Sequence, residues 1–520
     1  MKNTIKLVSV ILLAIAAAFG VSAVEITDFS QITDMEGIYE LVSDITIPSD
    51  FTPIGSESEP FAGTLDGKGH KVTGSYSSIF GYTRDATIKN INIENAKLEA
   101  DTVFGGITAV AGERTKIYNC SFEGDVTVDN DGTYVIGGGI AGVIEKYASV
   151  ENCYSDVTLS VTERPYALSF GGIAGENDGR ISYCYTDGFI SSDSDKYRVC
   201  LGGMAGKNRD NGFIIGCFNN AAVSGKVTAE ASQIFAGGIA GVNSESCYIE
   251  RCGNTGKITG EGYLVYPAYT GGIVGLNING AVKIVKNTAV ITTVRAIAGG
   301  IAGMNLSNGA YAYINDTLNS GAVIKHDSVV GGITALNSVI EKNGTTVYVR
   351  YALNLNSNKA VAENQGETAE IYNMGESDGV STAVTADGLK TDGIPSLENH
   401  DKIWVNNTEI SALPDMLVVG DERKAQLIAS NIGDGGDVAY YLYSPDASGY
   451  AKAFTAVYFN GSRYLSMDYV EKAPTEMYAR LKATDIPEGT TRIKFIAFAE
   501  TFGASFKPAE VLSTEIAYTK

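Results

Sequence analysis

Five of the seven cysteines recur at a nearly constant interval, which limits the chemistry that they can do. Steps of 33, 31, 33 and 35 residues separate Cys120, Cys153, Cys184, Cys217 and Cys252. If each step is one coil of a repeat, neighbouring cysteines lie about 4.8 Å apart with parallel side chains. A disulfide needs Cβ atoms that face each other, so we predict a buried ladder of reduced thiols, with a disulfide or metal site as the alternative. Cys200 and Cys247 lie outside this column and are not assigned to it.

Two other kinds of motif resemble ligand-binding loops but are incomplete. Residues 137–142 satisfy GxGxxG, yet the same glycine pattern recurs eight times and no helix is expected after it, so close packing explains it better than a dinucleotide. Residues 129–132 (Asp-Asn-Asp-Gly) begin like a calcium loop, but position twelve is Ile140 rather than Glu. Residues 434–437 are similarly incomplete. We therefore expect no cofactor, with weak calcium binding as the alternative to solvated turns.

The residues give little support for catalysis. His70, His326 and His400 are isolated from one another in the sequence. Parallel β-helix enzymes that cleave polysaccharides gather carboxylates with Arg or Lys on neighbouring coils, and we find no column that is acidic in three successive coils. A polysaccharide lyase or hydrolase is therefore the alternative and not the leading hypothesis.

An aromatic column follows the cysteine column by one residue. If the cysteines point inward, the next residue of each coil points outward. Tyr154, Tyr185 and Phe218 then form an exposed strip, with Tyr183 nearby at a corner. Flat aromatic faces suit sugar rings or a protein partner, although the same strip could serve only to stabilise the wall.

Composition and charge exclude some partners. The 520 residues include 39 Lys and Arg against 60 Asp and Glu, a net charge of −21, so nucleic acid is a poor partner. Residues 1–23 combine two early lysines, an apolar run from Leu7 to Val21 and small residues before a cleavage site, as a signal peptide does. No other segment is apolar enough to cross a bilayer. We expect a protein that is secreted or held on a cell surface by its partners, and not an integral membrane protein.

A glycine pentad repeats through the middle of the chain. Its copies begin at Gly105, Gly138, Gly171, Gly202, Gly237, Gly271, Gly299 and Gly331. A second signature comes after each pentad: an apolar residue and, three positions after it, a small or apolar one, as in Ile117/Cys120. We assign the last copies of this signature to Ile284/Asn287, Ile314/Thr317, Val349/Ala352 and Ile371/Met374. Because both members look buried although they are an odd number apart, we expect a corner between them, made by a residue that tolerates a left-handed backbone. About ten coils of short strands predict an all-β fold, a right-handed parallel β-helix.

The repeats resemble those of the GLUG-motif proteins, which are secreted bacterial repeat proteins with Gly-apolar-x-Gly, seen here at 139–142. Residues 60–67, Pro-Phe-Ala-Gly-Thr-Leu-Asp-Gly, match the start of such an array, and Trp404 with Leu413-Pro414 is similar to its end. The resemblance covers about residues 26–414. It implies cell-surface association and adhesion. Such repeats flank a metallopeptidase in some large relatives, but this chain contains no HExxH.

These patterns divide the chain into four parts. After the signal peptide, residues 24–60 form an N-terminal cap with a short helix over 28–35 and a first strand. Residues 61–414 form the β-helix with its closing segment. In residues 415–520 the pentads stop and strand-like runs recur every 10–15 residues, which predicts a small β-sandwich that resembles Ig-like modules.

The leading hypothesis is a secreted or cell-surface, non-catalytic, adhesin-like binding or spacer protein. Its partner is expected to be a glycan or a host or cell-surface protein. The alternative is a polysaccharide-active enzyme, either a lyase or a hydrolase. Two or more carboxylates beside a basic residue on one wall would favour this alternative.

Overall fold

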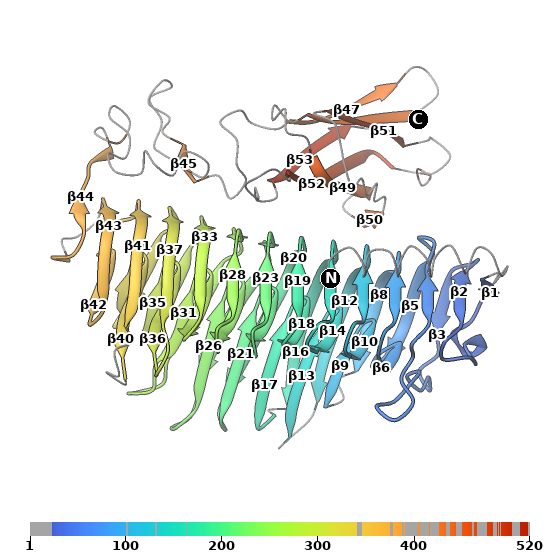
Figure 1. Ribbon diagram of the computed structural model, residues 1–520, viewed down its shortest axis with the longest axis horizontal. Helices are drawn as coiled ribbons and strands as arrows, with labels where there is room; N and C mark the ends of the chain where they lie inside the picture. The colour runs from blue at the N-terminus through green and yellow to red at the C-terminus, as the bar shows by residue number, and fades with distance from the viewer. Residues whose placement is uncertain are drawn as a thin grey trace, which may run out of the picture.

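The computed structural model describes residues 23–386 except 100–101, 130–132, 164, 341–345 and 375–377, and beyond them short stretches that include strands β45 to β53. The described chain is almost entirely β, and strands β1 to β44 pair only in parallel. Figure 1 shows these strands stacked coil on coil along one axis. The prediction of an all-β parallel β-helix is confirmed. The signal peptide lies outside the described residues apart from Ala23.

The largest sheet has 26 strands and contains a corner. The strands before the corner are β1 (Val24–Ile26), β2 (Ile38–Leu41), β4 (Thr64–Asp66), β7 (Thr87–Lys89), β11 (Lys116–Tyr118), β15 (Ser149–Glu151), β19 (Arg180–Ser182), β23 (Phe213–Ile215), β28 (Tyr248–Glu250), β33 (Ala281–Asn287), β37 (Ala312–Asn319), β41 (Val347–Asn354) and β43 (Glu367–Asn373). β33, β37, β41 and β43 continue through the corner. The strands after the corner are β3 (Ile45–Ile47), β5 (Lys71–Tyr76), β8 (Asn92–Glu99), β12 (Ser121–Asp129), β16 (Tyr154–Glu163), β20 (Tyr185–Ser194), β24 (Phe218–Asn219), β25 (Ala222–Val227), β29 (Gly253–Asn254), β30 (Ile258–Glu261), β34 (Ile291–Val294), β38 (Val323–His326) and β44 (Thr382–Ala383).

Two further sheets complete the coils. The eight-stranded sheet contains β9 (Val103–Gly105), β13 (Tyr134–Gly138), β17 (Ala167–Gly171), β21 (Arg198–Gly202), β26 (Gln233–Gly237), β31 (Ala268–Gly271), β35 (Ala296–Gly299) and β39 (Val329–Gly331). The ten-stranded sheet contains β6 (Phe80–Thr83), β10 (Thr108–Ala111), β14 (Ala141–Ile144), β18 (Ala174–Asn177), β22 (Ala205–Asn208), β27 (Ala240–Ser244), β32 (Val274–Ile278), β36 (Ala302–Ser307), β40 (Thr334–Val339) and β42 (Val361–Asn364). Eight coils therefore have all three walls. The coils of β6 and β42 lack a strand in the eight-stranded wall, so the structure has eight complete coils where about ten were expected.

The pentad forms the tight turn between these two sheets. A Cβ added to Gly172 would lie 2.3 Å from the carbonyl oxygen of Gly203 in the next coil, so only glycine fits between stacked turns. Ile173, the apolar residue of the same pentad, is fully buried in the core. Close packing of the backbone, and not ligand binding, therefore accounts for the GxGxxG pattern.

The left-handed corner is present in ten successive coils, but its register differs from the prediction in two of them. Asn90, Asn119, Asn152, Tyr183, Gly216, Arg251, Ile284, Asp316, Tyr351 and Glu370 all have positive φ there. Strand pairing aligns Val282 with Ile249 and Ile314, which places Val285, not Asn287, beside Cys252 and Thr317. In the last copy Thr368 and Ile371 are the pair, not Ile371 and Met374. The apolar spacing predicted the wrong register at β33 because Ile284 itself occupies the left-handed corner position.

Two ladders of buried asparagines run along the core, and the sequence analysis missed both. In each ladder the side-chain NH₂ of one Asn donates to the Oδ1 of the Asn in the next coil. The first ladder joins Asn177, Asn208, Asn243, Asn277, Asn305, Asn337 and Asn364 at 2.7–2.9 Å. The second joins Asn219, Asn254, Asn287, Asn319, Asn354 and Asn373. Most of these amides also donate to backbone carbonyls, as Asn208 does to Gly212.

The N-terminal segment differs from the short helix expected over 28–35. Only a 3₁₀ turn forms, η1 (Phe29–Gln31), with a capping box between Asp28 and Gln31. Ile32 leaves the turn with extended backbone angles because its side chain is buried in the core of the first coil. β1 pairs in parallel with β2, so the segment begins the large sheet.

The C-terminal strands pair in antiparallel fashion. They are β45 (Trp404–Val405), β46 (Asp415–Met416), β47 (Gln426–Ile432), β48 (Asp437–Tyr443), β49 (Tyr450–Phe459), β50 (Ser462–Tyr464), β51 (Glu476–Leu481), β52 (Arg492–Thr501) and β53 (Glu510–Ala517). β47, β48 and β51 form one sheet, and β49, β50, β52 and β53 form another. Within the described residues, no helix has the length and apolar character needed to cross a bilayer.

Candidate functional site

The five column cysteines lie just past the corner of the large sheet. All are free and buried. The thiol of each donates to the carbonyl oxygen two residues earlier, at 3.3 Å for Cys120 and Cys252 and 3.4 Å for Cys184. The thiol therefore bonds across the left-handed corner residue. Burial raises the pKa of the Cys120, Cys184 and Cys252 thiols, which keeps them protonated and unreactive.

Cys200 and Cys247 lie in other parts of the coil. Cys200 is buried beside Phe235 and Val242, between the outer faces of the eight- and ten-stranded sheets. The Cys247 sulfur accepts the backbone N–H of Gly212 at 3.2 Å. Burial raises the pKa of Cys200 to about 11 and of Cys247 to about 12.

The expected exposed strip of Tyr154, Tyr185 and Phe218 is present as a stack but not as an exposed surface. The ring centroids are 5.6 and 6.0 Å apart, and the planes are nearly parallel. Only 3% of Tyr154 and 7% of Tyr185 is exposed, and Tyr183 at the corner is also buried. The rings cover one another, and Phe218 covers Gly253, whose added Cβ would lie 2.6 Å from the ring. The prediction of an accessible aromatic strip is therefore wrong at these residues.

A different set of stacked tyrosines is exposed, and we call it the tyrosine edge: Tyr134, Tyr166 and Tyr197. These residues lie at or just before the start of β13, β17 and β21 and are 60%, 38% and 41% exposed. The Tyr166 and Tyr197 rings stack at 5.2 Å, and Tyr134 meets Tyr166 edge-on at 5.3 Å. Their spacing of 32 and 31 residues was a usable signal in the sequence.

A second aromatic set occupies the outer face of the large sheet before the corner. Phe213 stacks on Tyr248 at 5.3 Å, and Tyr313 stacks on Tyr348 at 5.1 Å. Tyr311 packs against the second pair. Cations lie over the rings: Lys283 over Tyr248 at 5.1 Å and Arg350 over Tyr348 at 4.2 Å. We call these five rings the aromatic wall.

A charged cluster lies on the ten-stranded sheet and the turns that follow it. Nε of Arg209 is 3.0 Å from Oε2 of Glu176 and 2.9 Å from Oδ1 of Asp178, and Lys207 Nζ is 2.8 Å from Oε1 of Glu176. Burial raises the pKa of Asp178 to about 6, Arg209 opposes the shift, and Asp210 and Glu176 add to it. Two carboxylates thus share one guanidinium on a single wall, an arrangement that favours an enzyme.

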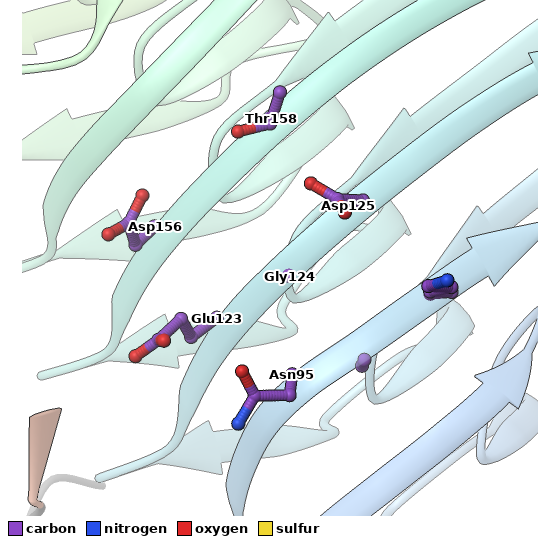
Figure 2. Close-up of a pocket in the computed structure, with 8 residues that line it drawn as sticks. Asn95, Glu123, Gly124, Asp125, Asp156 and Thr158 are labelled. Carbon is purple, nitrogen blue, oxygen red and sulfur yellow. The ribbon is translucent and has the colours of Figure 1, made fainter. Parts of the chain in front are cut away.

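One column is acidic in three successive coils, contrary to the expectation that none is. Strand pairing aligns Glu123 with Asp156 and Asp156 with Asp187. Glu123 and Asp156 line a groove of about 360 Å³ on the large sheet, where Figure 2 shows their carboxylates on neighbouring strands together with Asn95 and Asp125. Each acid lies three residues after a column cysteine (Cys120, Cys153 and Cys184), so the alignment was a usable signal in the sequence.

Within the part of the chain that the structure describes, no group of three His, Cys, Asp or Glu side chains is arranged to hold a metal ion. The two incomplete calcium motifs fall largely outside the described residues, since 130–132 and 434–436 are not described. Asp129 and Asp437 are the end residues of β12 and β48.

Comparisons with known proteins give no family and no functional assignment. No family model matches the chain, and no curated protein matches its sequence. One similar solved structure is a candidate immunoglobulin A1 protease from Bacteroides ovatus, at 18% identity and a TM-score of 0.31 over 76% of this chain and 93% of that chain. Another is an IgA1 protease, at 10% identity and a TM-score of 0.34 over 82% of this chain and 33% of that chain. Neither likeness is close enough to assign an activity.

Proposed function

We propose that this chain is a secreted or cell-surface binding protein of the GLUG-repeat type, whose β-helix presents exposed aromatic side chains to a glycan or a protein partner without catalysis. The observation that carries the proposal is the tyrosine edge. Its three rings come from successive coils and contact one another in series, although Tyr134 is paired with Ala167, one residue after Tyr166. A soluble protein gains little by exposing such a row unless a partner covers it.

The energetics fit a multivalent contact. One aromatic contact is worth about 0.5–1.5 kcal/mol beyond the area that it buries. Three rings that already stack on one another at the starts of strands cost little entropy to order on binding. Several molecules on one surface would raise the affinity further through avidity.

The test compares the wild-type chain with the triple variant Tyr134→Ser/Tyr166→Ser/Tyr197→Ser on arrays of glycans and cell-surface proteins. We expect the wild type to bind a defined set of partners and the triple variant to lose them by at least about tenfold in affinity. Phe189→Ser is the matched control, because Phe189 is an exposed aromatic of the same coils outside the edge. Equal binding by the triple variant, or no partner for the wild type, would contradict the proposal.

The charged cluster favours a second candidate function, a polysaccharide-active enzyme. A carboxyl group with a pKa near 6 can donate a proton near neutral pH, which suits Asp178 as a general acid. Glu176 contacts the same guanidinium and would be the second carboxyl group of the pair. In such an enzyme, Lys207 and Arg209 would bind the acidic groups or hydroxyls of a sugar.

Activity on a panel of acidic and neutral polysaccharides separates the two functions. For an enzyme we expect new reducing or unsaturated ends with the wild type, and at least about a hundredfold loss in Asp178→Asn with substrate binding kept. Lys226→Gln serves as a control, because Lys226 pairs with Glu261 on a different wall. If the wild type leaves every polysaccharide intact, the binding function stands alone.

A further inference from the structure

Two large apolar side chains are exposed together at the tip of one loop. Leu264 is 62% and Val265 is 83% exposed, and both lie between β30 and β31. The flanking Tyr263 and Tyr266 exchange two backbone N–H···O bonds of 2.9 and 2.8 Å, and both tyrosines pack against the hydrophobic core. Leu264 and Val265, which we call the apolar knob, are therefore held in place by a hydrogen-bonded turn.

The knob keeps an apolar residue where the backbone disfavours one. The φ of Leu264 is 50°, in the left-handed region that Gly or Asn adopts at lower cost. The exposure of both side chains to water adds a second cost, because the free chain gains no burial from them. A conformation and a surface that both lower stability indicate that the tip has a function.

The knob and the tyrosine edge lie on the same rim of the β-helix. The tyrosine edge occupies the connection from the large sheet to the eight-stranded sheet in three coils, and the knob occupies this connection in a later coil. The knob lies two coils after Tyr197, because β21 pairs with β26 and β26 pairs with β31. Figure 1 shows β13, β17, β21, β26 and β31 side by side along the array. Two coils span about 9.6 Å at the sheet spacing, so one partner can contact both features.

Arg198 adds a positive charge between the tyrosine edge and the knob. Its guanidinium carbon lies 5.5 Å from the ring centroids of both Tyr197 and Phe235, and Phe235 belongs to the next coil. Its Nη2 donates to Oε1 of Gln233 at 3.3 Å, and no carboxylate of the described residues forms an ion pair with it. In a chain with a net charge of −21, this cation is available to a carboxylate of a partner.

The stacked tyrosine rings present edges and hydroxyl groups to a partner. Tyr166 lies between Tyr134 of the preceding coil and Tyr197 of the next, and Tyr197 lies between Tyr166 and the Arg198 guanidinium. A pyranose ring stacks on an aromatic face, and both faces of these two rings are occupied. The aliphatic side chains of the knob form no hydrogen bonds with the hydroxyl groups of a sugar. A glycan therefore fits this surface poorly.

A membrane also fits this surface poorly. Two aliphatic side chains bury less apolar area than one acyl chain, and even a single acyl chain binds a membrane only marginally. Anionic lipids repel a chain with a net charge of −21.

We propose that the tyrosine edge, Arg198 and the apolar knob form one docking surface for a protein that offers an apolar socket to the knob and a carboxylate to Arg198. This inference rests on the binding function proposed above and names the class of its partner. Tyrosine and arginine are the side chains that most often dominate the binding energy of protein–protein interfaces. The N–H groups of a guanidinium bind a carboxylate in charge-assisted hydrogen bonds.

The test screens the full chain on arrays of purified cell-surface proteins and of neutral and acidic glycans, and then titrates each hit. We expect protein hits without glycan hits. Leu264→Asn/Val265→Ser suits the left-handed turn and removes the knob, so it should weaken each protein hit at least about tenfold, as should Arg198→Gln. Val24→Ser/Val42→Ser is the matched control, because it removes two exposed aliphatic side chains at the N-terminal end of the array and should bind as the wild type does.

Circular dichroism and thiol protection verify the fold of every variant. Protein hits that the knob variant binds as the wild type does would overturn the docking surface. Hits on the glycan array alone, lost in the tyrosine-edge triple variant, would overturn the protein class and leave the proposed binding function standing. Binding of the wild type, but not of the knob variant, to vesicles of equal parts phosphatidylcholine and phosphatidylglycerol would assign the knob to a membrane and overturn the proposal. No hit on either array would overturn both the docking surface and the proposed function.

Discussion

At the scale of single residues, burial sets what the chemistry-bearing side chains can do. The column thiols sit in the apolar core and hydrogen-bond to backbone carbonyls, so they act as small packing groups with a donor. Asp178 differs because burial raises its pKa while Arg209 still contacts it. The same physical cause makes the cysteines inert and makes this carboxyl group a proton donor.

The thiols should be unreactive in the folded protein. All seven cysteines are free and buried, and only an exposed thiolate reacts readily. We expect a thiol reagent at neutral pH to label almost none of them before unfolding and all seven afterwards. Mass spectrometry of native and denatured samples measures this, and a disulfide in the non-reduced, denatured chain would contradict the thiol ladder.

Asp178 should make the protein less stable as the pH rises from about 4 to about 7. Its pKa is raised from 3.8 to about 6, so the folded state holds the proton more tightly than the unfolded state does. The stability that this proton contributes is fully present below the unfolded pKa and is lost as the pH passes the folded pKa. After allowance for solvent screening the change is about 1 kcal/mol.

Chemical denaturation of the wild type and of Asp178→Asn at the two pH values measures this effect. The Asn variant cannot titrate, so the unfolding free energy of the wild type should fall relative to that of the variant as the pH rises. Asp193→Asn, which removes a carboxyl group on the large sheet, shows how much the unfolding free energy changes with pH for other reasons. A difference between wild type and Asp178→Asn that does not vary with pH would refute the assignment.

At the scale of elements, the corner of the large sheet imposes one backbone conformation on ten different residues. Asn and Gly adopt the left-handed region at little cost, but Tyr183, Arg251 and Tyr351 adopt it too. Ile284 is the least suited, since its φ is 52° and its side chain is β-branched. The stacked strands on both sides determine the corner more strongly than the preference of any one residue.

Replacing Ile284 by Asn should therefore stabilise the protein. The left-handed conformation costs an ordinary residue about 1–2 kcal/mol, and less for Asn. Ile284 is only partly buried, so little apolar contact is lost, and we expect a net gain of about 1 kcal/mol in the unfolding free energy. Thermal denaturation of Ile284→Asn measures it. Ile215→Asn, on the same wall without positive φ, should not be stabilised, and an equal effect of both changes would count against the strain.

At the scale of the whole molecule, a net charge of −21 is distributed over a long, narrow array. Like charges repel in the compact state, and salt screens them over a distance of about 10 Å at 0.1 M. The described ion pairs are few and mostly exposed, so their loss in salt costs little.

The protein should consequently become more stable when salt is added. We expect its unfolding temperature to rise by a few degrees, about 2–4 °C, between about 0.02 and 0.3 M NaCl, since repulsion is screened before specific hydration effects matter. Scanning calorimetry at fixed pH measures the shift. An equal rise at pH 4.6, where the calculated net charge is near zero, would show that repulsion is not the cause.

The sequence by itself determined the solenoid. Periodic glycine pentads and the column of Cys120 to Cys252 reveal the coil length, because each coil must bury the same positions and turn at the same places. Parallel pairing, the buried cysteines and the left-handed corner all follow from that period. The asparagine ladders follow the same period, so their positions were also readable from the sequence.

Only the tertiary structure decided which outward residues are accessible and which lie side by side. Tyr154 and Tyr134 are both tyrosines at strand starts, yet one is buried and the other exposed. Pairing between coils also fixes the register around Ile284, which the apolar spacing misplaced. Which wall a side chain occupies depends on where each coil bends, and bending is set by backbone packing between neighbouring coils, a contact that no single repeat contains.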